Sequence, residues 1–277
     1  MKIRRKTIPI KSNLKDLNNI KILHIGDLHL SGKNSRIESF ISRLSKEDVD
    51  FLFITGDVID NDKAVPWACK YLKKLKPKYG SWLCLGNHDE HDLDLRNFFA
   101  FHKMRKRLKA NNIDSFVSSM KNIGIKPLLN ETEDVVIGKT KVSIAGIVIP
   151  FGIDRHRPND PFFKESLRRL SDFFAEKKNE DFNIVLTHLP DMVETIENIH
   201  GDLYLAGHTH GGQVRLPFIG PLFAFSKIQK RYDRGMFKLE NSYLNVTAGL
   251  GQSRETPIRL FCPPEATIIT LNCNKCI

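Results

Sequence analysis

Residues 21–30 read KILHIGDLHL, and residues 51–60 read FLFITGDVID. Each stretch starts with a short run of mostly apolar residues, a pattern that favours a buried β-strand. Each run ends at a Gly-Asp pair, and glycine permits the sharp turn that directs the following side chain back over the sheet. The two stretches therefore predict two strand–turn units, with Asp27 and Asp57 at the ends of their strands.

Three further polar motifs follow apolar runs in the same way. They are Gly86-Asn87-His88-Asp89, Thr187-His188 and Gly207-His208-Thr209-His210. Ligands bind at the carboxyl ends of the strands in α/β sheets. One Gly-Asp pair after a strand is usually only a turn, but turn chemistry does not explain five such motifs at successive strand ends. We therefore expect one functional site assembled from all five.

Apolar runs alternate with amphipathic stretches through most of the chain. The expected strands are Lys21–Ile25, Phe51–Thr55, Trp82–Leu85, Val142–Ile147, Ile184–Thr187 and Leu203–Ala206. The expected helices are Ser35–Leu44, Pro66–Leu75 and Pro161–Ala175. This alternation is typical of βα units around a buried sheet and predicts the α/β class.

The last third of the chain has a different pattern. Met236–Leu239, Ser242–Val246 and Ala266–Leu271 are expected to be strands with no helices between them. They predict a second sheet, mixed or antiparallel. No linker or internal repeat is visible, so residues 1–277 are expected to form a single domain.

The side chains of the five motifs form a set of nitrogen and oxygen donors. The candidate metal ligands are Asp27, His29, Asp57, Asn87, His188, His208 and His210. Carboxylate and imidazole groups suit Zn, Fe and Mn, whereas the absence of cysteine from the set disfavours copper(I) and iron–sulfur clusters. Two metal ions close together need a donor set of about this size and a group that bridges them. His88 is left over beside the site and is a candidate general acid.

Charge and hydropathy limit the kinds of partner that the protein is expected to bind. The formal net charge is +11 at pH 7, which favours an anionic partner such as a phosphorylated substrate, an acidic membrane surface or nucleic acid. No run approaches the ~18 apolar residues that a membrane span needs. The first residues, MKIRRKTIPIK, lack the apolar region of a secretory signal. We expect a cytoplasmic protein that can lie peripherally on the inner face of the membrane.

The motif order D-x-H, G-D-x-x-D, G-N-H-D, H and G-H-x-H, from Asp27 to His210, resembles the calcineurin-like metallophosphoesterases. The segments 207–217 (GHTHGGQVRLP), 249–251 (GLG) and 257–265 (PIRLFCPPE) resemble one bacterial branch of that superfamily. The branch includes peripheral or membrane-anchored phosphodiesterases and UDP-2,3-diacylglucosamine pyrophosphatases. The resemblance implies a four-layer α/β/β/α sandwich, in which two mixed sheets are flanked by helices.

The resemblance also implies roles for the motif residues. One metal ion would be held by Asp27, His29 and His210, and the second by Asn87, His188 and His208, with Asp57 bridging them. Mn²⁺ is expected first, with Fe and Zn²⁺ as alternatives. A hydroxide between the two metals would cleave a phosphodiester or pyrophosphate bond. His88 would protonate the leaving group and Asp60 would orient His88, although Asp60 could instead cap a helix.

Two segments could choose the substrate. A basic and aromatic helical insertion is expected near residues 94–122, and an apolar loop lies near residues 216–225. Together they would suit a lipid-linked phosphate such as UDP-2,3-diacylglucosamine at an anionic membrane surface, unless their phenylalanines pack on the domain itself. Two alternatives stay open: a general phosphodiesterase or nuclease, although no nucleic-acid module is recognised, and a non-catalytic scaffold with the same fold. The sequence does not indicate an oligomeric state.

Overall fold

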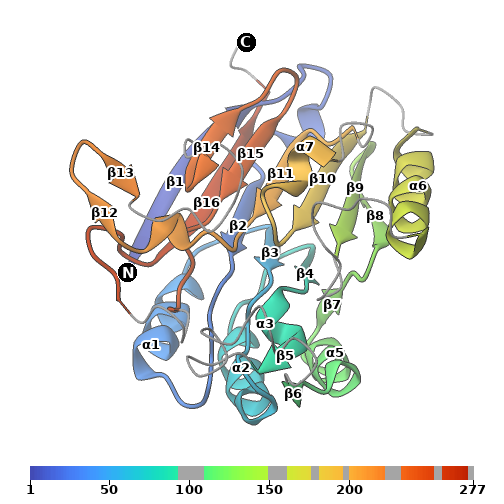
Figure 1. The fold of residues 1–277 in the computed structure, drawn as a ribbon. Coiled ribbons are helices and arrows are strands. Elements are labelled where there is room, and N and C mark those ends of the chain that lie inside the picture. Colours follow the sequence, from blue (N-terminus) through green and yellow to red (C-terminus); the bar gives the residue numbers. More distant parts are fainter. Residues whose placement is uncertain are drawn as a thin grey trace.

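Two six-stranded sheets pack face to face at the centre of the fold (Figure 1), with strands β3 and β4 of one sheet against β9, β10 and β11 of the other. The structure is a computed structural model, and it describes residues 1–92, 109–148, 161–175, 181–195, 200–221, 232–252 and 258–273. Because each inner face is covered by the other sheet, the strands that meet there are apolar on both sides.

The first sheet has the strand order β1-β16-β2-β3-β4-β7. Its strands are β1 (Lys2–Pro9), β2 (Lys21–Ile25), β3 (Phe51–Thr55), β4 (Gly80–Cys84), β7 (Ile125–Pro127) and β16 (Glu265–Asn272). All neighbours run parallel except β16 and β2, which are antiparallel. Every residue of β3 is buried, so its apolar sequence lies at the centre of the sheet.

The second sheet has the order β14-β15-β11-β10-β9-β8. Its strands are β8 (Glu131–Ile137), β9 (Thr140–Ile147), β10 (Phe182–Thr187), β11 (Leu203–Ala206), β14 (Gly235–Lys238) and β15 (Tyr243–Val246). The central pairs are parallel, whereas the two edge pairs, β8 with β9 and β14 with β15, are antiparallel hairpins. Both sheets are therefore mixed.

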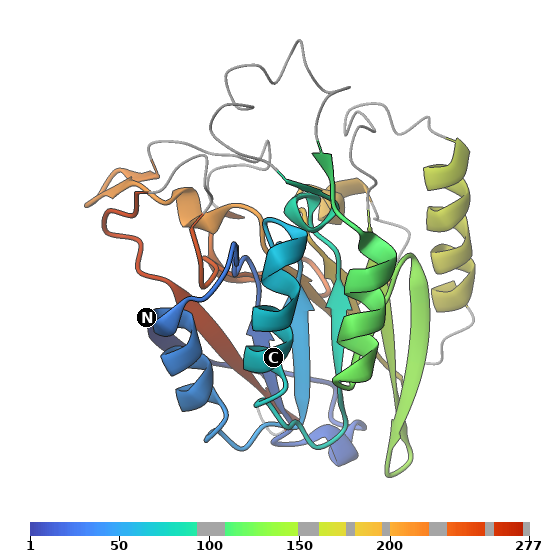
Figure 2. The ribbon, with the colours of Figure 1, turned by 90° about the horizontal axis from the view of Figure 1, so that it is seen from below.

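Helices cover the outer faces of the two sheets (Figure 2). The helices α1 (Ser35–Leu44), α2 (Val65–Leu72) and α5 (Ile113–Asn122) lie together outside the first sheet, and α6 (Pro161–Ala175) lies beside the second. The order of layers is helix, sheet, sheet, helix, which confirms the expected α/β/β/α sandwich. Short elements complete the described chain: η1 (Lys15–Leu17), η2 (Asp62–Ala64), α3 (Asn87–Glu90), β5 (His91–Asp92), β6 (Lys109–Ala110), α7 (Met192–Thr195), η4 (His210–Gly212), β12 (Arg215–Leu216) and β13 (Gly220–Pro221).

The sequence explains where the covering helices begin and which face they bury. The side chain of Asn34 accepts a hydrogen bond from the backbone N–H of Ile37, and this cap starts α1. Asn112 starts α5 in the same way through the N–H of Ser115. Helix α1 then buries the side chains of Ile37, Phe40, Ile41 and Leu44 at helical spacing against the sheet.

The prediction that the strands in the last third of the chain form a separate sheet was wrong. Those strands do not form a sheet of their own: β14 and β15 extend the second sheet, and β16 enters the first sheet between β1 and β2. The reason is that sheet membership is decided by long-range pairing, here residues 265–272 with residues 2–9, which local patterns do not record.

The two segments expected to choose the substrate are described only in part. Of the insertion near 94–122, residues 94–108 lie outside the described residues. Its last part is α5, which buries Phe116 and Met120 and contacts β7. Of the apolar loop near 216–225, residues 222–225 lie outside the described residues, and the rest includes β12, β13 and the turn between them. Among the described residues, no helix is long and apolar enough to cross a membrane.

Candidate metal centre

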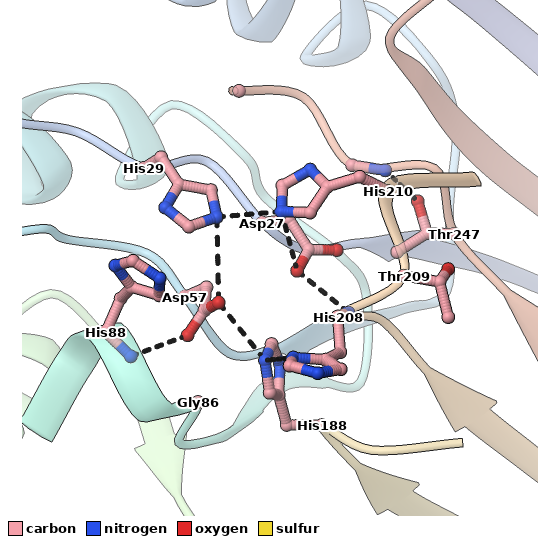
Figure 3. A network of polar contacts seen from close by, with 12 residues as sticks. Asp27, His29, Asp57, Gly86, His88, His188, His208, Thr209, His210 and Thr247 are labelled. Carbon is pink, nitrogen blue, oxygen red and sulfur yellow. Dashed lines mark hydrogen bonds and ion pairs between the residues drawn. The ribbon is translucent and has the colours of Figure 1, made fainter. Parts of the chain in front are cut away.

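All seven candidate ligands lie where strands end. Asp27 and His29 follow β2, Asp57 follows β3 and Asn87 starts α3 directly after β4. His188 follows β10, and His208 and His210 follow β11. The site therefore spans the carboxyl ends of both sheets, and Figure 3 shows the carboxylates and imidazoles pointing toward one another.

Two groups of donors share one carboxylate, and a third group consists of His29, Asp60 and His88. The first group consists of Asp27, His29, Asp57 and His210, and the second of Asp57, His188 and His208. Within each group, one ligand atom from every residue lies within 4.8 Å of the others. Because Asp57 belongs to both groups, it is the one carboxylate in a position to bridge two ions among these residues.

The backbone at these positions adopts the left-handed conformation, which non-glycine residues rarely take. The φ angles are 49° at Asp27, 46° at His29, 50° at Asp57, 69° at His208 and 51° at His210. Such residues cost about 1–3 kcal/mol each and persist only where the surrounding structure holds them, typically at functional sites. The same strained turn recurs at five candidate ligands, so their side chains are directed inward by the fold.

Glycines leave room for the two carboxylates. A Cβ atom at Gly86 would lie 2.2 Å from Oδ1 of Asp57, and one at Gly249 would lie 2.5 Å from Cβ of Asp27. Both distances are far below van der Waals contact, so any side chain at Gly86 or Gly249 would displace a carboxylate.

Hydrogen bonds outside the centre orient two of the imidazoles. Nδ1 of His188 lies 2.7 Å from the carbonyl oxygen of Thr55, and Nδ1 of His29 lies 2.8 Å from Oδ1 of Asp60. A carbonyl oxygen only accepts, so Nδ1 of His188 carries a proton, and Nε2 is the nitrogen left to bind a metal ion. Metal-binding histidines are commonly fixed in this way by a carbonyl or carboxylate.

The interior of the site has the polarity that a cation would satisfy. Nε2 of His29 lies 2.9 Å from Nε2 of His210, and Nδ1 of His208 lies 3.2 Å from Nε2 of His188. Oδ2 of Asp27 and Oδ1 of Asn87 are buried without a hydrogen-bond partner in the described structure. Buried oxygens without a partner are unfavourable alone, and carboxylate, amide and imidazole groups are donors that divalent transition metals accept. The residues present therefore fit the expected ions.

Ionisation in the site is set by the competition between burial and neighbouring charge. Burial would raise the pKa of Asp57, but the nearby His188, His88 and His29 hold it well below its usual value. Burial would lower the pKa values of His29 and His188, yet the carboxylates around them raise both to about 9. Burial raises the pKa of Asp27 to about 6. Without metal, protonated imidazoles thus balance the carboxylates, so metal binding would release protons.

His88 and Asp60 lie together next to the first donor group. His88 is 4% exposed, and its Nδ1 lies 3.4 Å from Oδ1 of Asp60. The same oxygen is closer to His29, at 2.8 Å, so Asp60 orients a candidate metal ligand as well as contacting the candidate acid. Asp60 caps no helix, because the N-cap residues nearby are Asn61 for η2 and Ala64 for α2.

Asp89 has a structural function that the sequence interpretation did not assign. Its Oδ1 accepts hydrogen bonds from the N–H groups of Val58 (2.8 Å) and Ile59 (3.0 Å), and its Oδ2 accepts from Gly86 (2.9 Å). This fully buried carboxylate therefore joins the turn after β3 to the turn after β4. The available signal was its place at the end of the Gly-Asn-His-Asp motif.

Arg259 was also missed, because it belongs to none of the five motifs. Its Nη2 donates hydrogen bonds to the carbonyl oxygens of Ala248 (2.7 Å) and Gly251 (2.6 Å) and lies 3.1 Å from Nδ1 of His210. Burial, with the positive charges of His29 and Arg259, lowers the pKa of His210 well below its usual value. Arg259 therefore joins the loop after β15 to a candidate ligand and favours the neutral imidazole that metal binding requires.

Comparison with known proteins agrees with this geometry. The family model described as calcineurin-like phosphoesterase matches residues 20–212. The uncharacterized metallophosphoesterase YkuE of Bacillus subtilis is 27% identical, over 95% of this chain and 83% of that protein. UDP-2,3-diacylglucosamine pyrophosphatase LpxG of Chlamydia trachomatis is 27% identical (91% and 84%), and phosphodiesterase YaeI of Escherichia coli is 28% identical (91% and 82%).

Fold and site together define a metal-dependent phosphoesterase, an enzyme that hydrolyses phosphate esters with divalent cations. Since the family model covers more than half of the sequence, including every motif from Asp27 to His210, the chain belongs to the calcineurin-like phosphoesterase family.

Proposed function

We propose that the protein binds two divalent cations, one within each of the two donor groups that contain Asp57, and uses them to hydrolyse a phosphodiester or pyrophosphate bond. Asp57 would bridge the ions, with Asp27, His29 and His210 on one side and Asn87, His188 and His208 on the other. The observation that carries this proposal is that both donor groups contain the Asp57 carboxylate. Mn²⁺ is the first candidate, with Fe and Zn²⁺ next, because all seven donors are nitrogen or oxygen.

The chain's own residues would then complete the reaction. Bound divalent ions supply a water-derived nucleophile at neutral pH and take up charge on the phosphoryl oxygens. His88 would donate a proton to the departing oxygen, since its imidazole lies at the edge of the first donor group. Asp60 would hold the His88 ring in place through the contact at Nδ1, leaving Nε2 to face the substrate.

For the substrate, we propose an acylated sugar nucleotide of the UDP-2,3-diacylglucosamine type, met at the cytoplasmic face of a membrane. The relative LpxG supports this substrate class by its name, and exposed apolar residues in the chain after His210 support a lipid partner. The net charge of +11 supports an anionic substrate.

A general phosphodiesterase acting on nucleotides or nucleic acid is the second candidate. It is favoured by the relative named phosphodiesterase YaeI and by the same positive charge. A non-catalytic scaffold is disfavoured, because the expected donor set has no gap.

One set of assays separates these candidates. Purified protein is supplied with Mn²⁺, Fe²⁺ or Zn²⁺ and tested on bis-p-nitrophenyl phosphate, on UDP-2,3-diacylglucosamine and on single-stranded DNA. We expect metal-dependent hydrolysis of the soluble diester, and release of UMP from the acylated sugar nucleotide but not from UDP-N-acetylglucosamine. Cleavage of DNA without release of UMP would show that the substrate is nucleic acid and not the acylated sugar nucleotide. No hydrolysis with any metal would refute the proposal that the protein is an enzyme.

A further inference from the structure

Exposed large apolar side chains are concentrated in one region of the described chain. Seven such residues are exposed among the described residues, and five of them lie in two short segments near β12, β13 and the start of β16. These five residues, called here the apolar docking surface, are Phe218 (110% exposed), Ile219 (73%), Ile258 (65%), Leu260 (44%) and Phe261 (61%). A cluster of this kind on an otherwise ordinary surface indicates a binding partner.

The two segments form one ribbon. Strands β12 and β13 make an antiparallel hairpin whose turn contains Phe218 and Ile219. Leu260 pairs alongside it: the N–H of Arg215 donates to the carbonyl of Leu260 at 3.0 Å, and the N–H of Leu260 donates to the carbonyl of Gln213 at 2.9 Å. The hairpin follows the candidate ligand His210 closely along the chain, so the apolar docking surface is connected to the metal centre by a short segment.

Two phenylalanines of this surface are held outward by unusual backbone. Phe218 has φ 66° and Phe261 has φ 53°, although bulky residues rarely enter the left-handed region. Neither ring is covered by the fold that strains its backbone. Strain that keeps an aromatic side chain in water is explained best by a function outside the monomer.

Basic residues flank the apolar docking surface. The N–H of Lys2 donates to the carbonyl of Pro264 at 2.9 Å, so the start of β1 lies three residues from Phe261 along the neighbouring segment. Arg43 of α1 reaches the same end of β1, where its Nη2 donates to the carbonyl of Met1 at 3.2 Å. The side chains of Lys2 and Arg43 are both exposed. Figure 1 shows the N-terminal end of β1 near the β12–β13 hairpin, and in Figure 2 the segment that leads into β16 lies between them.

We propose that the apolar docking surface inserts into the interfacial region of an anionic lipid bilayer, with Lys2 and Arg43 against the lipid headgroups. Apolar tips next to basic residues are the arrangement by which proteins bind to anionic membranes without spanning them. A bilayer fits the charge pattern, because Phe218 and Ile219 lie in an exposed hairpin turn and the basic residues of the neighbouring segments are exposed as well. The proposal deepens the proposed function, on which the choice of a lipid partner partly rests.

Vesicle binding tests the proposal with a matched control. The full-length protein is sedimented with vesicles of phosphatidylcholine alone or with 30% phosphatidylglycerol. The test variants are Phe218→Asn and Phe261→Asn, singly and together, because asparagine tolerates the left-handed backbone. Val136→Asn is the control: Val136 is 66% exposed on β8, on the opposite side of the molecule in Figure 1.

We expect the wild type and the control to bind the anionic vesicles, and the double variant to bind at least tenfold more weakly, on the order of what loss of two apolar anchors causes. Lys2→Glu and Arg43→Glu together should reduce binding to anionic vesicles while binding to neutral vesicles stays low. Equal binding by the double variant and the wild type, or no binding by the wild type, would overturn the proposal. Self-association that the double variant abolishes would reassign the surface to a second copy of the chain.

Hydrolysis of bis-p-nitrophenyl phosphate keeps this test separate from the proposed function. The variants of the apolar docking surface should hydrolyse this soluble diester at the wild-type rate. If the wild type binds vesicles but hydrolyses nothing, the docking surface stands and the proposed function fails. If the wild type hydrolyses the diester but does not bind vesicles, the proposed function stands and the docking surface fails.

Discussion

A hydrogen bond joins Asp57 to His88: the backbone N–H of His88 donates to Oδ1 of Asp57, with 2.9 Å between the two atoms. The other carboxylate oxygen of Asp57, Oδ2, faces the imidazoles of the two donor groups. It lies 3.1 Å from Nε2 of His188 and 3.6 Å from Nε2 of His29. One carboxylate therefore fixes the backbone of the candidate acid and is shared by both donor groups.

This arrangement predicts the effect of Asp57→Asn. The amide keeps an oxygen that can accept from His88, but it removes the negative charge shared by the two groups. We expect the metal content to fall from two ions per chain to one or none, measured by mass spectrometry after dialysis. The control is Asp48→Asn, since the Asp48 side chain is 99% exposed. Unchanged metal content in Asp57→Asn would show that Asp57 does not bridge.

The role of His88 predicts a dependence on the leaving group. His88→Ala should retain both metals and lose roughly 10²–10⁴-fold in rate on an alkyl phosphodiester, because that leaving group needs a proton. The loss on bis-p-nitrophenyl phosphate should be much smaller, since p-nitrophenolate leaves without one. Steady-state rates on both substrates measure the difference. Equal losses on the two substrates would exclude proton donation by His88.

Arg259 should act through His210 rather than on the substrate. Arg259→Gln removes a guanidinium that joins two loops next to a candidate ligand, and loss of such support typically costs roughly 10–100-fold in metal affinity. We expect weaker metal binding by competition with a chelator and partial recovery in Arg259→Lys. The control is Arg168→Gln on α6, where the arginine pairs with exposed carboxylates. Wild-type affinity in Arg259→Gln would limit Arg259 to a structural role.

The burial of His24 predicts how the stability of the protein changes with pH. Burial lowers the pKa of His24 to about 3 from an ordinary value of 6.5, so between these values the unfolded chain binds more protons than the folded protein. The contribution of His24 to stability is therefore present above pH 6.5 and is lost as the pH falls toward 3.

The measurement is urea unfolding with a chelator present, from pH 4 to 6.5. The free energy of unfolding should fall with decreasing pH less steeply in His24→Gln than in the wild type. The difference in slope should reach up to about 1.4 kcal/mol per pH unit. Identical slopes would mean that His24 is protonated in the folded state.

Much of the fold could be predicted from local patterns, because the central strands are short apolar runs. The runs at 21–25, 51–55 and 203–206 are strands with the expected bounds. Strand β1 was missed because it is an edge strand rich in Lys and Arg, whose single fully buried residue is Ile8. Its parallel pairing with β16 joins the two ends of the sequence, and no local pattern carries that information.

The site, like the fold, has features that local sequence patterns predict and features that they do not. The candidate ligands were found because each follows a strand in a short polar motif, and the fold brings the strand ends together. The left-handed backbone at Asp27 and His29 could not be predicted, since neither residue is glycine. Arg259 acts on His210 from 49 positions away through one guanidinium, so only the folded structure indicates its role.

The most direct test is anomalous diffraction from crystals of the protein grown with Mn²⁺. We predict two anomalous peaks about 3.5–4 Å apart on either side of the Asp57 carboxylate. One should lie among Asp27, His29 and His210, and the other among Asn87, His188 and His208. A single peak that Asp57 does not contact, or no peak at millimolar Mn²⁺, would contradict the dinuclear centre.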